Sequence, residues 1–508
     1  MLSFSVYSNG RLVDAIDLAG AYVVGSDDVP LRAETSFQDG IIKCQKRAAG
    51  PAGLALPFDI PGFGRVLLET IRVQERERAY VLQVELARGR LMRLLSKMED
   101  WGLADYAPAA AILAKIEAGR DALIRALQAE TPAESAKLAE ESLRITVPAS
   151  EELTQLHADL FLSRRKQTGA MPKRSLGCAI GLDKPNELSR KQVVSGFDFV
   201  NVPIVWRDIE PTEKNFNWKP LDAWVDVLMK QRVPMRGLSL LSFHESNVPD
   251  WLYTWEHDFD TLRDLAFEHV RRVLSRYGQY ITSWSVVSGL HASNCFSFNF
   301  EQLMELTRMA TALTKQLAPR AVALLDLVSP WGEYYARNQR TIPPLLFAEA
   351  AGQSGVNFDA FGLQLRFGPG VDGMYVRDMF QISSMLDQFT KVNKPLHITA
   401  VQVPSNTAVS PSGDPARPTP AINGGTWRDP WSEPVQASWL RRFVEIALSK
   451  PFVESVSWGT LWDAPRSMVP NGGLLRADFT AKAAFTEFTD IRAELSGKAR
   501  RPAPNAAP

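Results

Sequence analysis

Cysteine is scarce in this sequence. Its 508 residues include three, Cys44, Cys178 and Cys295, which lie far apart in the chain. An odd number of widely separated cysteines gives neither a disulfide framework nor the paired spacing of a zinc site. Histidine is also sparse, with six residues and no His-x-His or His-x-x-x-His pair. No glycine-rich loop has the lysine spacing of a P-loop. We therefore expect reduced thiols, no bound metal and no cofactor.

An excess of either charge is also lacking, and so are long apolar runs. Lys plus Arg and Asp plus Glu number 57 each, a balance that produces no general field to attract nucleic acid or an anionic membrane. No run of about 18 apolar residues could form a membrane span. The opening MLSFSVYSNG has no basic segment followed by an apolar one, as a secretory signal requires. We expect a cytoplasmic protein without nucleic-acid or membrane partners.

Tryptophan, in contrast, is plentiful. Of 13 tryptophans, 12 lie between Trp206 and Trp462. Aromatic faces suit the apolar C–H faces of sugar rings, but large aromatic side chains also commonly fill protein cores. Composition alone leaves both uses open.

The first 170 residues divide into two segments. Residues 1–75 predict a β-rich, sandwich-like module, because Asn9-Gly10 and Asp39-Gly40 are hairpin turn signals between β-type runs. Residues 76–170 predict a helical connector, because apolar residues recur there at helical spacing. Thr131-Pro132-Ala133-Glu134 has the form of a helix-opening capping box. We expect Pro148 to end that helix.

From residue 171 to 495, short apolar runs alternate with helical segments. Eight strands with intervening helices are typical of a (β/α)8 TIM barrel, an α/β fold. The Pro/Ala-rich segment 496–508 predicts a disordered tail. The expected helices span 219–232, 260–276, 301–318, 376–391, 434–449 and 481–495. The expected strands are Gly177–Ile180, Phe197–Val202, Pro234–Leu240, Ser283–Val287, Val322–Leu327, Ala360–Leu365, Leu396–Val401 and Ser455–Trp458.

One connection in the barrel region is unusually long. Between Val403 and Pro434 it contains six prolines, Pro404, Pro411, Pro415, Pro418, Pro420 and Pro430. Connections this long are usually functional or disordered. Since it follows a strand's carboxyl end, where barrels bind ligands, we expect a lid or rim.

The barrel region resembles the family 10 glycoside hydrolases, the xylanase family, over about 320 residues. The order and spacing of several segments carry the resemblance, although each is weak alone. They are LGCAIG, FDFVNVPIVWRDIEPTEKNFNW, MRGLSLLSFHESNVPDWL, RYGQYITSWSVVSG, FGLQLRF, KPLHITAVQV, SVSWGTLWD and GGLLRADFTAKAAF. The resemblance implies a barrel that acts on or binds a β-linked polysaccharide such as xylan.

The departures from the family pattern fall at its catalytic positions. The family strand Trp-Asp-Val-Val-Asn-Glu ends in the acid/base, and here Ser288 and Gly289 align with Asn-Glu. The nucleophile of the family's Ile-Thr-Glu strand aligns with Ala400. A retaining glycosidase needs two carboxyl groups about 5–5.5 Å apart, and neither Gly nor Ala supplies one. Three supporting positions of the family align with Asn201, Val202 and Arg366.

Three hypotheses follow. The first is a non-hydrolytic descendant that still binds an oligosaccharide or polysaccharide. The second is an active endo-β-xylanase-like hydrolase with relocated carboxylates, and the third, weaker one is a structural scaffold. Candidate relocated carboxylates are Glu245, Asp250, Glu256, Glu333, Asp429, Glu433 and Asp463. Candidate substrate-binding residues, chosen as aromatic or polar groups near predicted strand ends, are Trp206, His244, Trp284, His291, Gln364, Arg366, Trp458, Trp462 and Asp463.

Overall fold

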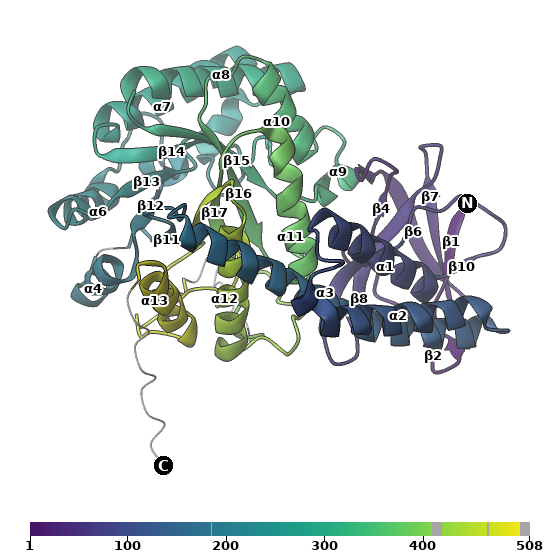
Figure 1. Ribbon diagram of the computed structural model, residues 1–508. Coiled ribbons are helices and arrows are strands. Elements are labelled where there is room, and N and C mark those ends of the chain that lie inside the picture. The colour runs from purple at the N-terminus through teal and green to yellow at the C-terminus, as the bar shows by residue number, and fades with distance from the viewer. Residues whose placement is uncertain (184, 409–418, 465–466, 498–508) are drawn as a thin grey trace.

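The computed structural model describes residues 1–183, 185–408, 419–464 and 467–497. A closed, parallel, eight-stranded barrel forms one side of the molecule, and an N-terminal β-module with three helices lies beside it (Figure 1). A disordered tail is predicted for residues 496–508, and residues 498–508 lie outside the described residues. So do Pro411, Pro415 and Pro418 of the long connection.

The predicted barrel is confirmed, because each of its eight strands overlaps one of the predicted strands. Adjacent strands pair in sequence order, and the first closes on the last. The strands are β11 (Leu176–Ala179), β12 (Phe199–Pro203), β13 (Met235–Leu238), β14 (Ile281–Ser288), β15 (Val322–Val328), β16 (Ala360–Arg366), β17 (Leu396–Gln402) and β18 (Val453–Trp458).

Helices cover the outside of the barrel. Their apolar faces pack on the strands, and α12 also contacts α3 of the N-terminal part. The helices of the barrel region, including short ones in the connections after strands, are α4 (Glu187–Gly196), α5 (Trp206–Ile209), α6 (Lys219–Lys230), η2 (Asp250–Trp255), α7 (Phe259–Tyr277), α8 (Phe300–Leu317), α9 (Glu333–Arg337), α10 (Pro344–Gln353), α11 (Met379–Gln388), η3 (Phe389–Val392), α12 (Glu433–Ser449) and α13 (Ala483–Leu495).

The N-terminal module contains two four-stranded sheets with a common apolar core. Asn9 and Gly10 both have positive φ, as do Asp39 and Gly40, as expected for the tight turns of two hairpins. The β-rich part extends beyond residue 75, because β10 pairs with β1. The strands are β1 (Leu2–Ser5), β2 (Tyr7–Ser8), β3 (Arg11–Leu12), β4 (Tyr22–Val24), β5 (Pro30–Leu31), β6 (Ala33–Gln38), β7 (Ile41–Lys46), β8 (Gly53–Ile60), β9 (Gly64–Glu69) and β10 (Tyr80–Val81).

The connector forms three α-helices and a short 3-10 turn: α1 (Leu82–Asp100), η1 (Ala107–Ala109), α2 (Ala110–Gln128) and α3 (Pro132–Gln167). Thr131 caps α3 as predicted, accepting from the backbone N–H of Glu134. The prediction that Pro148 ends this helix is wrong, since α3 continues through it to Gln167. Tertiary packing explains the difference, because the following turn is buried against the barrel and held there by Glu151.

Buried ionic contacts join the N-terminal part to the barrel. Arg90 of α1 pairs with Asp378, the N-cap of α11, and both side chains are almost fully buried. Glu151 of α3 accepts from the Trp427 indole at 2.7 Å and from Arg428 at 2.8 Å. Trp427 and Arg428 belong to the long connection, and the backbone N–H of Thr426 donates to Arg65 of the module. The described end of that connection therefore forms a rim between barrel and module.

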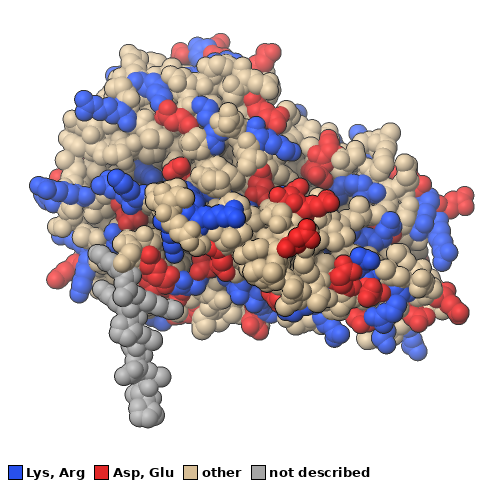
Figure 2. All heavy atoms as spheres, viewed as in Figure 1, with Lys and Arg blue, Asp and Glu red and all other residues tan. Residues whose placement is uncertain are grey.

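The surface carries interspersed charges of both signs over the face shown in Figure 2. No helix among the described residues is long and apolar enough to span a membrane.

Candidate functional site

The two positions aligned with the family's catalytic glutamates lie at the same end of the barrel. Gly289 directly follows β14, and its N–H donates to the Asp326 carbonyl at 2.9 Å. Ala400 lies in the last part of β17, in register with Gln364 of β16. Both residues therefore lie near the carboxyl ends of the strands, where barrel enzymes hold their active sites.

A buried carboxylate lies between these two positions. Asp326 of β15 is 1% exposed. One of its oxygens accepts from the Thr399 hydroxyl, and the other accepts from Gln364 at 2.5 Å and from Ser288 at 3.3 Å. Four neighbouring strands, β14 to β17, thus contribute one layer of polar side chains to the barrel interior.

The local sequence makes room for this carboxylate. Gly362 is in register with Asp326, and a Cβ at Gly362 would come within 2.3 Å of Asp326 Oδ1. A side chain at this position would therefore displace the carboxylate. Burial raises the pKa of the Asp326 carboxyl, although the donors Thr399 and Gln364 stabilise its charged form.

Gln364 connects Asp326 to Arg366, the last residue of β16. The Gln364 amide nitrogen donates to Asp326, and its amide oxygen accepts from Arg366 Nη1. Arg366 is half-buried, in the next inward-facing position of the strand towards the mouth. Beneath this layer, Asn201 donates to the Thr399 carbonyl and to the Ser457 hydroxyl.

His244 lies in the connection that follows β13, also at the barrel mouth. Its Nδ1 accepts from the backbone N–H of Ser246 at 3.1 Å, so in the neutral ring the proton is on Nε2. Burial lowers the pKa of the His244 imidazole, and the positive charge of Arg366 lowers it further. His244 is therefore a neutral hydrogen-bond donor at the barrel mouth.

The four tryptophans proposed for substrate binding are all buried. Trp206 stacks on His269, with ring centroids 4.3 Å apart, and donates to Glu210. Trp284 points out of the barrel onto Gly237, where a Cβ would come within 2.2 Å of the indole. Trp458 is 0% exposed and donates to the Gly472 carbonyl. Trp462 is 4% exposed and stacks near Trp224. None of these indoles presents an open face on which a sugar could stack.

His291 and Asp463 also have internal partners. His291 is 1% exposed, bonds the Val328 carbonyl through Nε2 and stacks on Phe347. Burial lowers the pKa of His291 to about 4. Asp463 accepts from Lys482 at 2.8 Å and from the Gly473 N–H. Of the predicted binding residues, the structure therefore brings Gln364 and Arg366 together beside Ser288, while His244 lies in the connection after β13 at the same end of the barrel.

Most of the candidate relocated carboxylates are paired with cations. Asp250 pairs with Arg207, Glu333 with the buried Arg377, Glu433 with Arg476, and Asp463 with Lys482. Glu256 lies against His257, and Asp429 is exposed near the module. Glu245 is exposed beside His244 at the mouth. Four of the candidates are thus held in ion pairs within the fold.

Two residues of this region were missed from the sequence. Asp326 was overlooked because the search for carboxylates covered loops, whereas Asp326 lies inside a strand. The signal was a lone acidic residue in the apolar run VALLDLV. Trp255, at the end of η2 in the connection after β13, is 38% exposed. No sequence signal distinguishes it from its buried neighbours.

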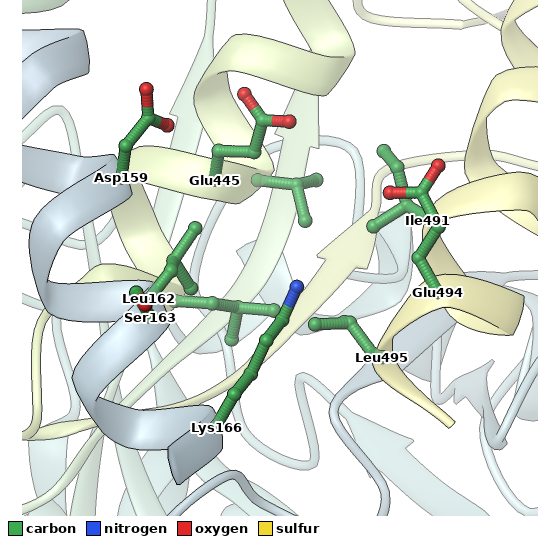
Figure 3. A pocket seen from close by; sticks show the side chains of 10 residues that line it. Asp159, Leu162, Ser163, Lys166, Glu445, Ile491, Glu494 and Leu495 are labelled. Atoms are coloured by element: carbon green, nitrogen blue, oxygen red, sulfur yellow. The ribbon is translucent and has the colours of Figure 1, made fainter. Parts of the chain in front are cut away.

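Two cavities lie away from the mouth. One of about 250 Å³ lies between α3, α12 and α13, where Lys166 points towards the acidic residues Glu445 and Glu494 (Figure 3). It is near the carboxyl ends of α12 and α13, which return towards the opposite end of the barrel. The other lies between α6 and α7. Among the described residues, no cluster of three or more His, Cys, Asp or Glu side chains could hold a metal ion.

The structure thus has a layer of polar residues at the carboxyl ends of the strands of a (β/α)8 barrel, the place where such barrels hold their active sites. The sequence profile of Glycosyl hydrolase family 10 matches residues 201–464. The chain belongs to this family.

Curated relatives include endo-1,4-beta-xylanase 1 of Gibberella zeae, which is 21% identical over 212 residues, or 40% of this chain and 57% of the relative. Endo-1,4-beta-xylanase 2 of Aureobasidium pullulans is 31% identical over 83 residues, 16% of this chain and 22% of the relative. The chain thus spans about half, or less, of the length of these relatives.

Solved structures with a similar fold include native xylanase 10B of Thermotoga maritima, 15% identical, with a TM-score of 0.47 and coverage of 64% of this chain and 97% of that one. Xylanase 10B of Thermotoga petrophila, in complex with xylobiose, is 17% identical with the same TM-score and covers 64% of this chain and 94% of that one.

Proposed function

We propose that the barrel mouth binds a β-linked, xylan-like glycan and does not hydrolyse it by the two-carboxylate retaining mechanism. The proposal is carried by Gly289 and Ala400, which we align with the family's two catalytic carboxylates, and by Asp326, which is buried beside them. Both Asp326 oxygens already accept hydrogen bonds from the protein. A carboxylate held in this way is poorly placed to attack an anomeric carbon or to protonate a leaving oxygen.

The polar groups that remain at the mouth support binding. Arg366 and His244 supply hydrogen-bond donors, and Trp255 supplies an exposed aromatic face. Few, well-placed polar groups beside an aromatic surface are typical of sugar sites. The three unpaired thiols fit our further proposal that the protein works in the reducing cytoplasm.

A paired assay tests this function. Xylan and xylo-oligosaccharides are incubated with the protein, and reducing-sugar release and binding by calorimetry are measured on the same preparation. We expect binding without release above the buffer background. Release of reducing sugar by the wild type would instead favour the alternative, a hydrolase with relocated carboxylates. Asp326→Asn and Glu245→Gln would then show which carboxylate the turnover needs.

A further inference from the structure

Arg366 and His244 both carry N–H groups at the mouth that no described residue accepts. Arg366 makes one hydrogen bond, from Nη1 to Gln364, and no ion pair with any residue of the described ranges. Its other N–H groups are therefore available to a ligand. His244 accepts at Nδ1 and so carries its proton on Nε2, which no described residue accepts.

The acceptors beneath these donors are already used. Asp326 receives bonds from Thr399, Gln364 and Ser288, and the Gln364 oxygen accepts from Arg366. The Ser288 hydroxyl both donates to Asp326 and accepts from Gln364. A neutral sugar hydroxyl both donates and accepts, whereas a carboxylate only accepts. Around Arg366 the donors are free and the neighbouring acceptors are occupied, which fits a carboxylate better than a hydroxyl.

The charge at the mouth points in the same direction. Arg366 brings a permanent positive charge. The Gln364 amide separates it from the Asp326 carboxylate, and the exposed Glu245 lies next to His244 in the chain. The positions that would carry two repelling carboxylates hold Gly289 and Ala400 instead. The planar fork of an arginine matches the two oxygens of a carboxylate in geometry as well as in charge.

We propose that Arg366 and His244 bind the carboxylate of a uronic acid, so that the preferred glycan of this barrel is an acidic one. This inference rests on the proposed glycan-binding function and adds its substrate class. Arg366 holds the carboxylate through its free N–H groups, and His244 donates to it through Nε2. Gln364 fixes the Arg366 guanidinium from below by accepting from Nη1.

Binding to matched oligosaccharides tests the proposal. The probes are cellotetraose, the same β-1,4-linked tetramer with every C6 oxidised to a carboxylate, xylotetraose, and acetate alone. Titration calorimetry at low and high salt measures each dissociation constant. We expect the acidic tetramer to bind about tenfold or more tightly than cellotetraose, as one charge-assisted pair provides. Added salt should reduce that preference.

Variants of Arg366 provide the second arm. Arg366→Gln should weaken binding of the acidic tetramer about tenfold more than it weakens binding of the neutral tetramers. Arg366→Lys, which keeps the charge but loses the fork, should keep part of the preference. Arg320→Gln removes an exposed arginine just before β15, at the opposite end of the barrel, and should change nothing. Thermal unfolding of each variant checks that it is folded.

The outcomes separate this inference from the function on which it rests. Equal binding of the acidic and neutral tetramers, or an Arg366→Gln variant that keeps the preference, would overturn the uronate site and leave glycan binding intact. Acetate binding as tight as that of the acidic tetramer would also overturn it, since the site would then recognise an anion without a sugar. Failure of all the tetramers to bind would overturn both proposals.

Discussion

Gln364 donates its side-chain N–H to the Asp326 carboxylate at an N···O distance of 2.5 Å. Because the same amide accepts from Arg366 through its oxygen, its two ends are fixed by chemistry, nitrogen towards the acid and oxygen towards the base. The amide therefore links a buried carboxylate to a cation at the barrel mouth. This link occupies the place in which the resemblance to family 10 hydrolases would put the machinery for bond cleavage.

Substitution of Gly362 by alanine should disrupt this link. The new Cβ would lie 2.3 Å from Asp326 Oδ1 and 2.9 Å from the Thr399 methyl group, so the carboxylate or the strand must shift. We expect Gly362→Ala to lower the free energy of unfolding by about 1–3 kcal/mol, measured by denaturant titration. Gly352→Ala is the matched control, because Gly352 in α10 has nothing within 4 Å. This control should gain about 0.5–1 kcal/mol, and an unchanged Gly362→Ala would contradict the packing described.

His291 should make the fold sensitive to acid. Burial lowers its pKa from 6.5 to about 4 in the folded protein, so the unfolded chain binds the extra proton between these values. Stability is therefore full above about pH 6.5 and falls by up to about 3 kcal/mol as the pH drops to about 4. His291→Phe keeps the stacking on Phe347 but loses the bond to Val328.

We expect His291→Phe to be less stable than the wild type at neutral pH by about 1–2 kcal/mol. Between pH 6.5 and 4 its free energy of unfolding should nevertheless fall less steeply, because the variant takes up about one proton fewer on unfolding. Denaturant unfolding at several pH values measures both slopes. If the free energy of unfolding depends on pH equally in both proteins, the pKa of His291 is not lowered in the folded state.

The architecture of the barrel could be predicted from sequence because its signal is repeated. Each strand is a short apolar run followed by a helical pattern, and an error at one boundary does not change the count. The continuation of α3 through Pro148 could not be predicted in this way. It depends on burial against distant residues such as Trp427 and Arg428, which contact Glu151 across the fold.

The site was less predictable than the fold, for a related reason. Residue type and strand position correctly predicted that Gln364, Arg366 and His244 lie at the mouth end of the barrel. The same reasoning also selected Trp284 and Trp458, which are fully buried. Whether an indole faces solvent depends on its neighbours, here Gly237 and the carbonyl of Gly472. These contacts join segments far apart in the chain.

Substitution of Trp458 and of Trp255 should distinguish a tryptophan that stabilises the fold from one that binds glycan. Trp458 is 0% exposed and bonded to Gly472, whereas Trp255 is 38% exposed. Trp458→Ala should lower the free energy of unfolding by about 3–5 kcal/mol. Trp255→Ala should leave stability within about 0.5 kcal/mol but weaken glycan binding about fivefold, the effect of about 1 kcal/mol of stacking. Glycan binding unaffected by Trp255→Ala would remove this indole from the site.

The N-terminal helices should be energetically coupled to the barrel through Arg90 and Asp378. Both side chains are nearly fully buried, so Arg90→Met leaves an uncompensated buried carboxylate, at a cost of about 3–5 kcal/mol. The double variant Arg90→Met with Asp378→Asn removes that charge and should recover part of the loss. Denaturant unfolding monitored separately near the helices and in the barrel measures the coupling. Equal stability of the single and double variants would contradict it.

Introducing glutamates at positions 289 and 400 tests our proposal that the chain does not use the two-carboxylate mechanism. A retaining mechanism needs both groups, so neither Gly289→Glu nor Ala400→Glu alone should release reducing sugar from xylan. The double variant should show slow but detectable release.

Gly289 has a φ of +66° and lies where a Cβ would be 3.3 Å from Val328, so the glutamate there is strained by about 1–2 kcal/mol. Ala400 is fully buried close to Gln364, so its glutamate must displace polar neighbours. We therefore expect the double variant to unfold at a lower temperature than the wild type. Release by either single variant would mean that a carboxylate already present serves as the second group, and combining that variant with Asp326→Asn would identify or exclude Asp326.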